Sequence, residues 1–200
     1  MDVLGSLSIM TLLSPVFLFL FIYIKLTSNG EVIYKQMRVG YMGKEFTMFK
    51  FRSMKEAGRK EHETYVKDLI KNPNKVMKKK DKEMLLIPLG GLIRSLGLDE
   101  LPQLFNVLRG EMSLVGPRPP LSYEVEEYLD WHSDRFDTVP GITGLWQVSG
   151  KNELSFNEMI SLDIQYASGY NFLGDLSILV QTIWTVIHLA IKHMSDLKRK

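Results

Sequence analysis

Cysteine is absent from this sequence of 200 residues, which excludes disulfides, thiolate metal sites and a cysteine nucleophile. There is also no Walker A loop and no GxGxxG motif. The formal net charge is only +2, so we expect no nucleic-acid partner. The length fits one domain with a real core. The four histidines form neither an HExxH motif nor an i, i+4 pair: His62, His132, His188 and His193.

Charged residues are missing between Asp2 and Lys25, and the 22 residues Val3–Ile24 are long enough to enter a membrane. The basic start and small-residue cleavage site of a signal peptide are missing too. Ser14 and Pro15 lie at the centre of this segment. Proline removes a backbone donor and bends a helix, which predicts a break at this point.

Two arrangements of the N-terminal segment are open from the residues alone. One is a kinked helix that spans the membrane, and the other is a helix-break-helix that enters and leaves on the same face. The hydroxyls of Thr11 and Ser14 are placed to satisfy backbone groups near the break. Basic residues follow the segment and favour a cytoplasmic position for the rest of the chain: Lys25, Lys35, Arg38 and Lys44.

A β-hairpin is predicted next, with strands at Glu31–Arg38 and Glu45–Met54 and a turn at Gly40–Gly43. Lys50 and Arg52 fall on the same face of the second strand. Two cations on one face can form an anion site, and the alternative is a solvated edge.

The stretch from Asp99 to Gly110 predicts a short helix. Pro102 is tolerated in a first turn, Asp99 is a good N-cap residue, and Gly110 is a natural stop. One apolar stripe recurs at i, i+3, i+4 and i+7: Leu101, Leu104, Phe105 and Leu108. Glu100 and Asp99 would then lie at the positive end of the helix dipole, which also attracts phosphate.

Asp99 can be read as a helix cap or as a catalytic carboxylate, and this stretch alone does not decide between them. Arg94 lies five residues earlier, close enough to share a site. Arg118 follows in a stiff loop between Pro117 and Pro119.

Residues 55–83 carry ten Lys or Arg residues against six Asp or Glu residues, and Asn72–Asn74 divides them into two predicted helical pieces. A solvated face is preferred over contact with anionic lipid headgroups. The glycine-rich stretch 140–152 contains Gln147 and is interpreted as a functional loop.

Two helices are predicted in the C-terminal third. Residues 157–166 carry Asp163 and Tyr166 at i, i+3 spacing. Residues 176–191 have no formal charge but are short for a span, so we expect a buried or interfacial helix.

With these residues in place, the chain resembles the bacterial sugar transferases, the monotopic polyprenyl-phosphate phosphoglycosyl transferases. The resemblance covers nearly the whole chain in order. The matching stretches are Ser14-Pro15, Gln36–Gly40 with Gly43-Lys44, Lys50–Met54, Ile93–Val107, Gly110–Pro119, Pro140–Gly144 with Trp146–Val148, and Leu162-Asp163 with Tyr166.

The resemblance implies a mainly helical α+β fold of the minimal type. It would have a Ser-Pro-broken re-entrant membrane helix at residues 1–27 and a catalytic domain at residues 28–200, with cytoplasmic catalytic helices, a small hairpin and interfacial amphipathic helices. It also implies a location on the cytoplasmic face of the bacterial inner membrane. Partners would be a UDP-sugar, undecaprenyl phosphate and membrane lipids, with downstream glycosyltransferases or a second copy as further candidates.

The implied reaction transfers a sugar phosphate from the UDP-sugar to undecaprenyl phosphate and releases UMP. It is magnesium-dependent and ping-pong, through a phosphosugar carried by Asp99, and Glu100 helps to hold the metal. Arg118, between Pro117 and Pro119, would face the nucleotide. Further candidates are three cations that would pair with phosphate or with the two acids: Lys50, Arg52 and Arg94. Three polar residues are also candidates: Gln147, Asp163 and Tyr166.

Two departures from the family pattern matter. Val139 stands where many members have a basic residue, and the basic residues that usually precede the acid at the position of Asp2 are missing. The alternatives to an active transferase are an inactive membrane scaffold of a glycan-assembly complex and an ordinary single-span anchoring protein.

Overall fold

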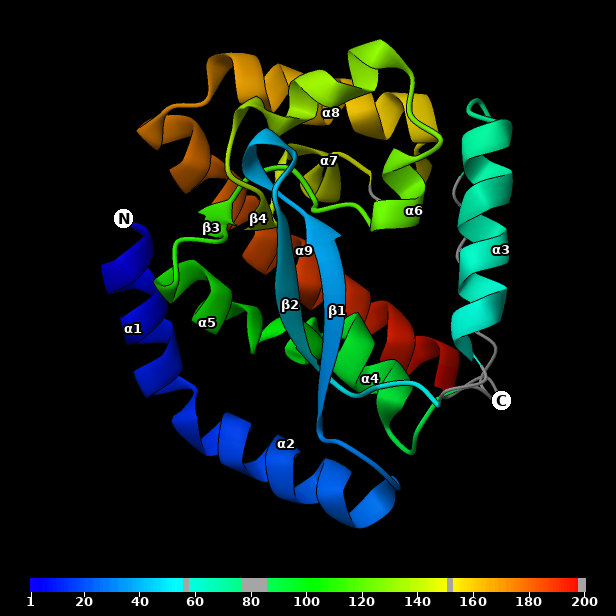
Figure 1. Ribbon diagram of the computed structural model, residues 1–200. Coiled ribbons are helices and arrows are strands. Elements are labelled where there is room, and N and C mark those ends of the chain that lie inside the picture. Colours follow the sequence, from blue (N-terminus) through cyan, green and yellow to red (C-terminus); the bar gives the residue numbers. More distant parts are fainter. Residues whose placement is uncertain (56–57, 77–85, 151–152, 198–200) are drawn as a thin grey trace.

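Figure 1 shows the computed structural model, which describes residues 1–55, 58–76, 86–150 and 153–197. The chain is mainly helical with a small antiparallel hairpin, as predicted. The helices are α1 (Asp2–Leu12), α2 (Ser14–Thr27), α3 (Gly58–Lys71), α4 (Gly90–Ser95), α5 (Gln103–Leu108), α6 (Ser122–Val125), α7 (Leu145–Val148), α8 (Phe156–Gly169) and α9 (Phe172–Leu197). The strands are β1 (Ile33–Val39), β2 (Glu45–Phe51), β3 (Ser113–Val115) and β4 (Gly141–Thr143), and 3-10 turns include η1 (Tyr41–Gly43), η3 (Leu98–Glu100) and η4 (Asp130–Asp137).

The N-terminal segment forms two helices that meet at an angle of 64° (Figure 1). The break falls at Leu13, and Pro15 lies in the first turn of α2, where its missing N–H leaves no intrahelical bond unmade. The predicted hydroxyl contacts are present, since Thr11 Oγ1 donates to Leu7 O and Ser14 Oγ donates to Thr11 O. A bend is therefore confirmed, one residue earlier than the Ser-Pro pair.

One face of α2 packs on the rest of the chain, while much of the helical pair stays exposed and apolar. Leu20 and Ile24 are buried against a cluster that also contains Phe51 and Ile93. The exposed apolar residues of the two helices include Val3, Leu4, Leu7, Leu12, Leu18, Phe19, Phe21, Ile22 and Leu26.

The hairpin supports the candidate site, and its register fixes which side chains share a face. Tyr34 pairs with Lys50, and Arg38 pairs with Phe46. Paired residues lie on the same face and alternate residues along each strand return to it. The predicted strands are confirmed with small shifts of their ends, and β2 stops at Phe51, before Arg52.

The helix predicted from Asp99 to Gly110 is wrong in its first part. Asp99 lies in the separate turn η3, and α5 begins only at Gln103, so Asp99 is not its N-cap. Gly97 has a φ of +67° and starts this turn in the left-handed region, which glycine adopts most easily. The positive end of the α5 dipole therefore does not lie at Asp99.

The C-terminal third is more ordered than the sequence suggests. The stretch interpreted as a loop contains β4, which pairs in parallel with β3, and the helix α7. The predicted helix 157–166 lies within α8. Over Phe172–Leu189 only 6% of residues are buried, so the buried alternative for this segment is wrong.

By length and composition, one described helix could cross a membrane, or two if the bent α1–α2 pair is a single span. In the basic segment 55–83 the first predicted helical piece is present as α3. The second piece, including 77–83 with its three consecutive lysines, lies outside the described residues. The division at residues 27 and 28 coincides with the end of α2 and stays a prediction.

Candidate active site

Two adjacent carboxylates form the first part of the site. Asp99 is buried, with 7% of its surface exposed, and Glu100 beside it is partly exposed. Lys50 Nζ lies 2.9 Å from Glu100 Oε1, an ion pair that joins β2 to η3. Ser53 Oγ donates to Asp99 Oδ2 over 3.5 Å, and Arg94 Nη1 donates to the same hydroxyl over 3.5 Å. The structure thus gathers two predicted cations around the predicted carboxylate pair.

Asn106 connects the free edge of β2 to α5, and the sequence reasoning gave it no role. Its side chain is fully buried. Its Nδ2 donates to the carbonyl oxygen of Thr47 (2.7 Å) and to Glu111 Oε2 (2.6 Å), and its Oδ1 accepts from the Phe49 N–H (3.1 Å). Two edge groups of β2 are thereby satisfied by one side chain next to Lys50.

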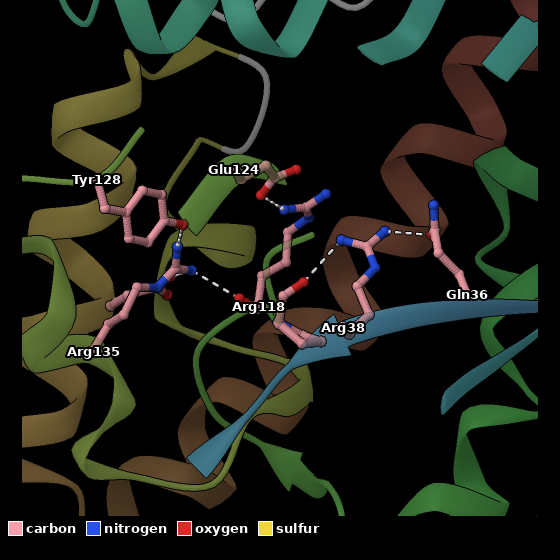
Figure 2. A network of polar contacts seen from close by, with 8 residues as sticks. Gln36, Arg38, Arg118, Glu124, Tyr128 and Arg135 are labelled. Atoms are coloured by element: carbon pink, nitrogen blue, oxygen red, sulfur yellow. Dashed lines mark hydrogen bonds and ion pairs between the residues drawn. The ribbon is translucent and has the colours of Figure 1, made fainter. Parts of the chain in front are cut away.

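A second cluster of charges surrounds Arg118, and Figure 2 shows its residues in a row. Arg118 Nη1 lies 3.2 Å from Glu124 Oε2. Arg38 donates to the carbonyl oxygen of Pro119 (2.9 Å) and to Gln36 Oε1 (2.8 Å). Burial and the nearby Arg118 lower the pKa of Arg38 to about 10. Burial raises the pKa of Glu124, but the arginines outweigh it and the net shift is downward.

Arg135 anchors this cluster from behind, and no sequence pattern pointed to it. It is fully buried, and it donates to the carbonyl oxygen of Arg118 (2.8 Å), to the hydroxyl of Tyr128 (2.6 Å) and to Asp163 Oδ2. Burial raises the pKa of Asp163 to about 6, against the opposing effect of Arg135. Asp163 is therefore part of the support of Arg118.

Main-chain contacts hold the loop that carries Arg118. Gly141 N donates to the carbonyl oxygen of Pro117 (2.9 Å), and Val39 N donates to that of Pro120 (3.0 Å). Gly116 leaves no room for a side chain, because a Cβ there would lie 2.4 Å from the carbonyl oxygen of Val139. Arg118 itself keeps 27% of its side-chain surface exposed. It is a fixed cation that a ligand can reach.

The two clusters lie on the same face of the hairpin. Arg38 and the Tyr34 partner of Lys50 are four residues apart on β1, about 13 Å at roughly 3.3 Å per residue. Three arginines and two acids give the Arg118 cluster a formal excess of one positive charge: Arg38, Arg118 and Arg135 against Glu124 and Asp163. The site is thus elongated, with carboxylates at one end and an excess cation at the other.

Three candidates from the sequence are not part of this arrangement. Arg52 donates to the carbonyl oxygen of Asn29 (2.5 Å), beyond the end of β2. The Tyr166 hydroxyl lies within hydrogen-bond distance of two acceptors, Asp175 Oδ1 (2.8 Å) and the carbonyl oxygen of Val115 (3.1 Å). Gln147 lies against Gly144, where a Cβ would be 2.7 Å from its Oε1.

Magnesium was expected at the carboxylate pair. Among the described residues there is no group of three or more His, Cys, Asp or Glu side chains that could hold a metal. Magnesium is often held by only one or two carboxylates plus substrate phosphates and water, so Asp99 and Glu100 are a suitable protein donor set.

Carboxylates beside an elongated cationic site, on a chain with an exposed apolar helical pair, suit a membrane-associated protein that handles phosphate esters. Residues 1–189 match the family model described as bacterial sugar transferase. The chain belongs to the bacterial sugar transferase family, and the resemblance predicted from its motifs is confirmed.

Several relatives support this assignment. The chain is 37% identical over 187 residues to the exopolysaccharide production protein ExoY of Rhizobium meliloti, covering 91% of this chain and 81% of that protein. It is 38% identical to the undecaprenyl-phosphate galactose phosphotransferase of Salmonella typhimurium, over 93% of this chain and 39% of that protein. It is 35% identical to the UDP-glucose:undecaprenyl-phosphate glucose-1-phosphate transferase of Klebsiella pneumoniae, over 92% of this chain and 38% of that protein.

Proposed function

We propose that this chain transfers a sugar-1-phosphate from a UDP-sugar to undecaprenyl phosphate, as the first membrane step of surface glycan or glycoprotein assembly. The observation that carries the proposal is the buried Asp99 beside the Glu100–Lys50 pair, on the same hairpin face as Arg118. The names of the Salmonella and Klebsiella relatives support the acceptor and the type of donor.

The first step is attack by the Asp99 carboxylate on the phosphorus that carries the sugar. A P–O bond forms to Asp99, the bridging P–O bond breaks, and UMP leaves with the bonding electron pair. Lys50 holds Glu100 in place beside the reacting group. A magnesium ion held there by the two carboxylates would neutralise charge on the diphosphate. Arg118 at the far end would bind the nucleotide part of the donor.

The second step returns Asp99 to its starting state. An oxygen of undecaprenyl phosphate attacks the same phosphorus, and the bond to the Asp99 carboxylate breaks. The products are polyprenyl-diphospho-sugar and the free enzyme, so the kinetics are ping-pong.

The proposal includes a re-entrant N-terminal segment on the cytoplasmic face of the inner membrane. Two contacts support it: Leu114 N donates to Asp2 Oδ1 (3.3 Å), and Gly5 lies against Leu114, so the start of α1 touches the domain that follows α2. Because the chain lacks cysteine, single cysteines at Asp2 and Thr27 can be labelled with an impermeant maleimide. Labelling from the same side is expected, and labelling from opposite sides would show a spanning segment.

Release of UMP tests the reaction. The protein in bilayer discs is incubated with a panel of UDP-sugars, with and without undecaprenyl phosphate. With one sugar we expect a stoichiometric burst without acceptor and turnover with it. Asp99→Asn should lose activity by on the order of 10⁴-fold, while the surface control Asp68→Asn keeps it. Full activity in Asp99→Asn would refute the nucleophile, and no protein-bound phosphosugar with any donor would favour the inactive scaffold.

A further inference from the structure

An apolar pocket of about 560 Å³ lies between α2, the hairpin and α5, on the face of the hairpin opposite to Lys50. Ser14 and Pro102 contribute to its wall. Phenylalanines provide most of the remaining lining: Phe17, Phe21, Phe49, Phe51 and Phe105. The mouth of the pocket includes exposed parts of Leu18 and Phe21, which continue into the apolar surface of α2.

Two exposed cations flank Phe49 in this pocket. The guanidinium of Arg109 lies 5.0 Å from the centre of the Phe49 ring and itself lines the pocket. Lys35 is the cross-strand partner of Phe49 in the β1–β2 register, so both side chains rise from the same face. Within the part of the chain that the structure describes, neither cation makes an ion pair.

The arrangement matches an anionic amphiphile, with an apolar chain inside the pocket and a phosphate at its rim. We propose that the pocket binds one acyl chain of an anionic membrane phospholipid, with the lipid phosphate between Lys35 and Arg109. Charge complementarity favours an anionic lipid over a zwitterionic one. The position favours a phospholipid over the polyprenyl acceptor, because the acceptor phosphate must reach Asp99 and Lys50 points from the other face of the sheet.

Bound lipid can be counted directly by native mass spectrometry of the protein in detergent micelles. Phosphatidylglycerol, phosphatidylcholine, undecaprenyl phosphate and inorganic phosphate are titrated separately and in competition. Phosphatidylglycerol should bind about tenfold more tightly than phosphatidylcholine. Arg109→Gln and Lys35→Gln should each weaken it about fivefold. Lys44→Gln, which removes a cation at the hairpin turn, should leave it unchanged.

Leu18→Trp tests the pocket itself, since this side chain is exposed at the mouth and a larger ring there obstructs the chain. It should reduce binding of phosphatidylglycerol in a folded protein. Equal binding of the two phospholipids, unaffected by the Arg109 and Lys35 variants, would refute the proposal. Displacement of bound phosphatidylglycerol by equimolar undecaprenyl phosphate would also refute it, because the pocket would then belong to the acceptor. Displacement by inorganic phosphate alone would refute it as well. No donor or turnover is needed, so this outcome is independent of the transferase assay.

Discussion

Replacing Asn106 by alanine should destabilise the protein far more than its size suggests. The change removes the partners of Thr47 O and Phe49 N on the edge of β2, together with the contact to Glu111. An unsatisfied buried group carries a penalty of about 1–3 kcal/mol. The two edge groups are partly buried, so we expect a loss of about 3 kcal/mol, a large part of a typical stability of roughly 5–15 kcal/mol.

Thermal unfolding in micelles, followed by tryptophan fluorescence, measures this loss. At about 2–4 °C per kcal/mol for a chain of this size, Tm should fall by roughly 6–12 °C. Asn106→Asp has nearly the same shape, and it should also destabilise because it loses the donor and places a carboxylate against Glu111. Asn72→Ala is the matched control, since the exposed side chain of Asn72 donates, within the described part of the chain, to Asp68 alone.

The same variant should slow the reaction beyond its effect on folding. Asn106 positions the strand that carries Lys50. The rate of UMP release, measured at a temperature where the variant is still folded, should therefore fall below that of the parent protein. If Asn106→Ala lowers Tm by no more than Asn72→Ala does, and if it releases UMP at the parent rate, then the edge contacts do not hold β2 in place. That result would refute the assigned role of Asn106.

Three further outcomes are expected from thermal unfolding in the same micelles. Arg135→Met leaves the Asp163 carboxylate buried without its partner and should destabilise by about 3–5 kcal/mol, whereas Arg135→Met with Asp163→Leu should recover most of that loss. Burial and Arg135 lower the pKa of His132 below 6.5. The free energy of unfolding that depends on neutral His132 is therefore complete above pH 6.5 and is lost as the pH falls below it. His132→Gln should flatten this dependence. Gly116→Ala should lower Tm through its clash with a backbone carbonyl, while Gly169→Ala, where a Cβ meets nothing, should not.

Local patterns predicted the hairpin well, and the family resemblance supplied Lys50 as a candidate partner of the acids, which its ion pair with Glu100 bears out. Strand alternation and turn glycines act over few residues, so the sequence carries them directly. The helix start at Asp99 failed because Pro102 is compatible with several starts. In the structure the left-handed Gly97 starts the turn η3, and Leu101 and Pro102 lie between that turn and α5.

Long-range partners could not be read from the sequence. Arg135 and Asp163 are 28 residues apart and Arg38 lies 81 residues before Pro119, with no periodic pattern to connect them. Family resemblance supplied Arg118 and Asp163 as candidates but not Arg135, which joins them. The pocket beside Phe49 likewise depends on three elements packing together.

The hydrogen bond between Leu114 and Asp2 also sets an order of events during synthesis. Its two ends are 112 residues apart. At about 5–20 residues per second, the ribosome needs roughly 6–22 seconds to make that interval. During this time the apolar α1–α2 pair has been made while the strand that clasps its start does not yet exist. The contact between Asp2 and Leu114 therefore forms late, after the α1–α2 pair has already been made without it.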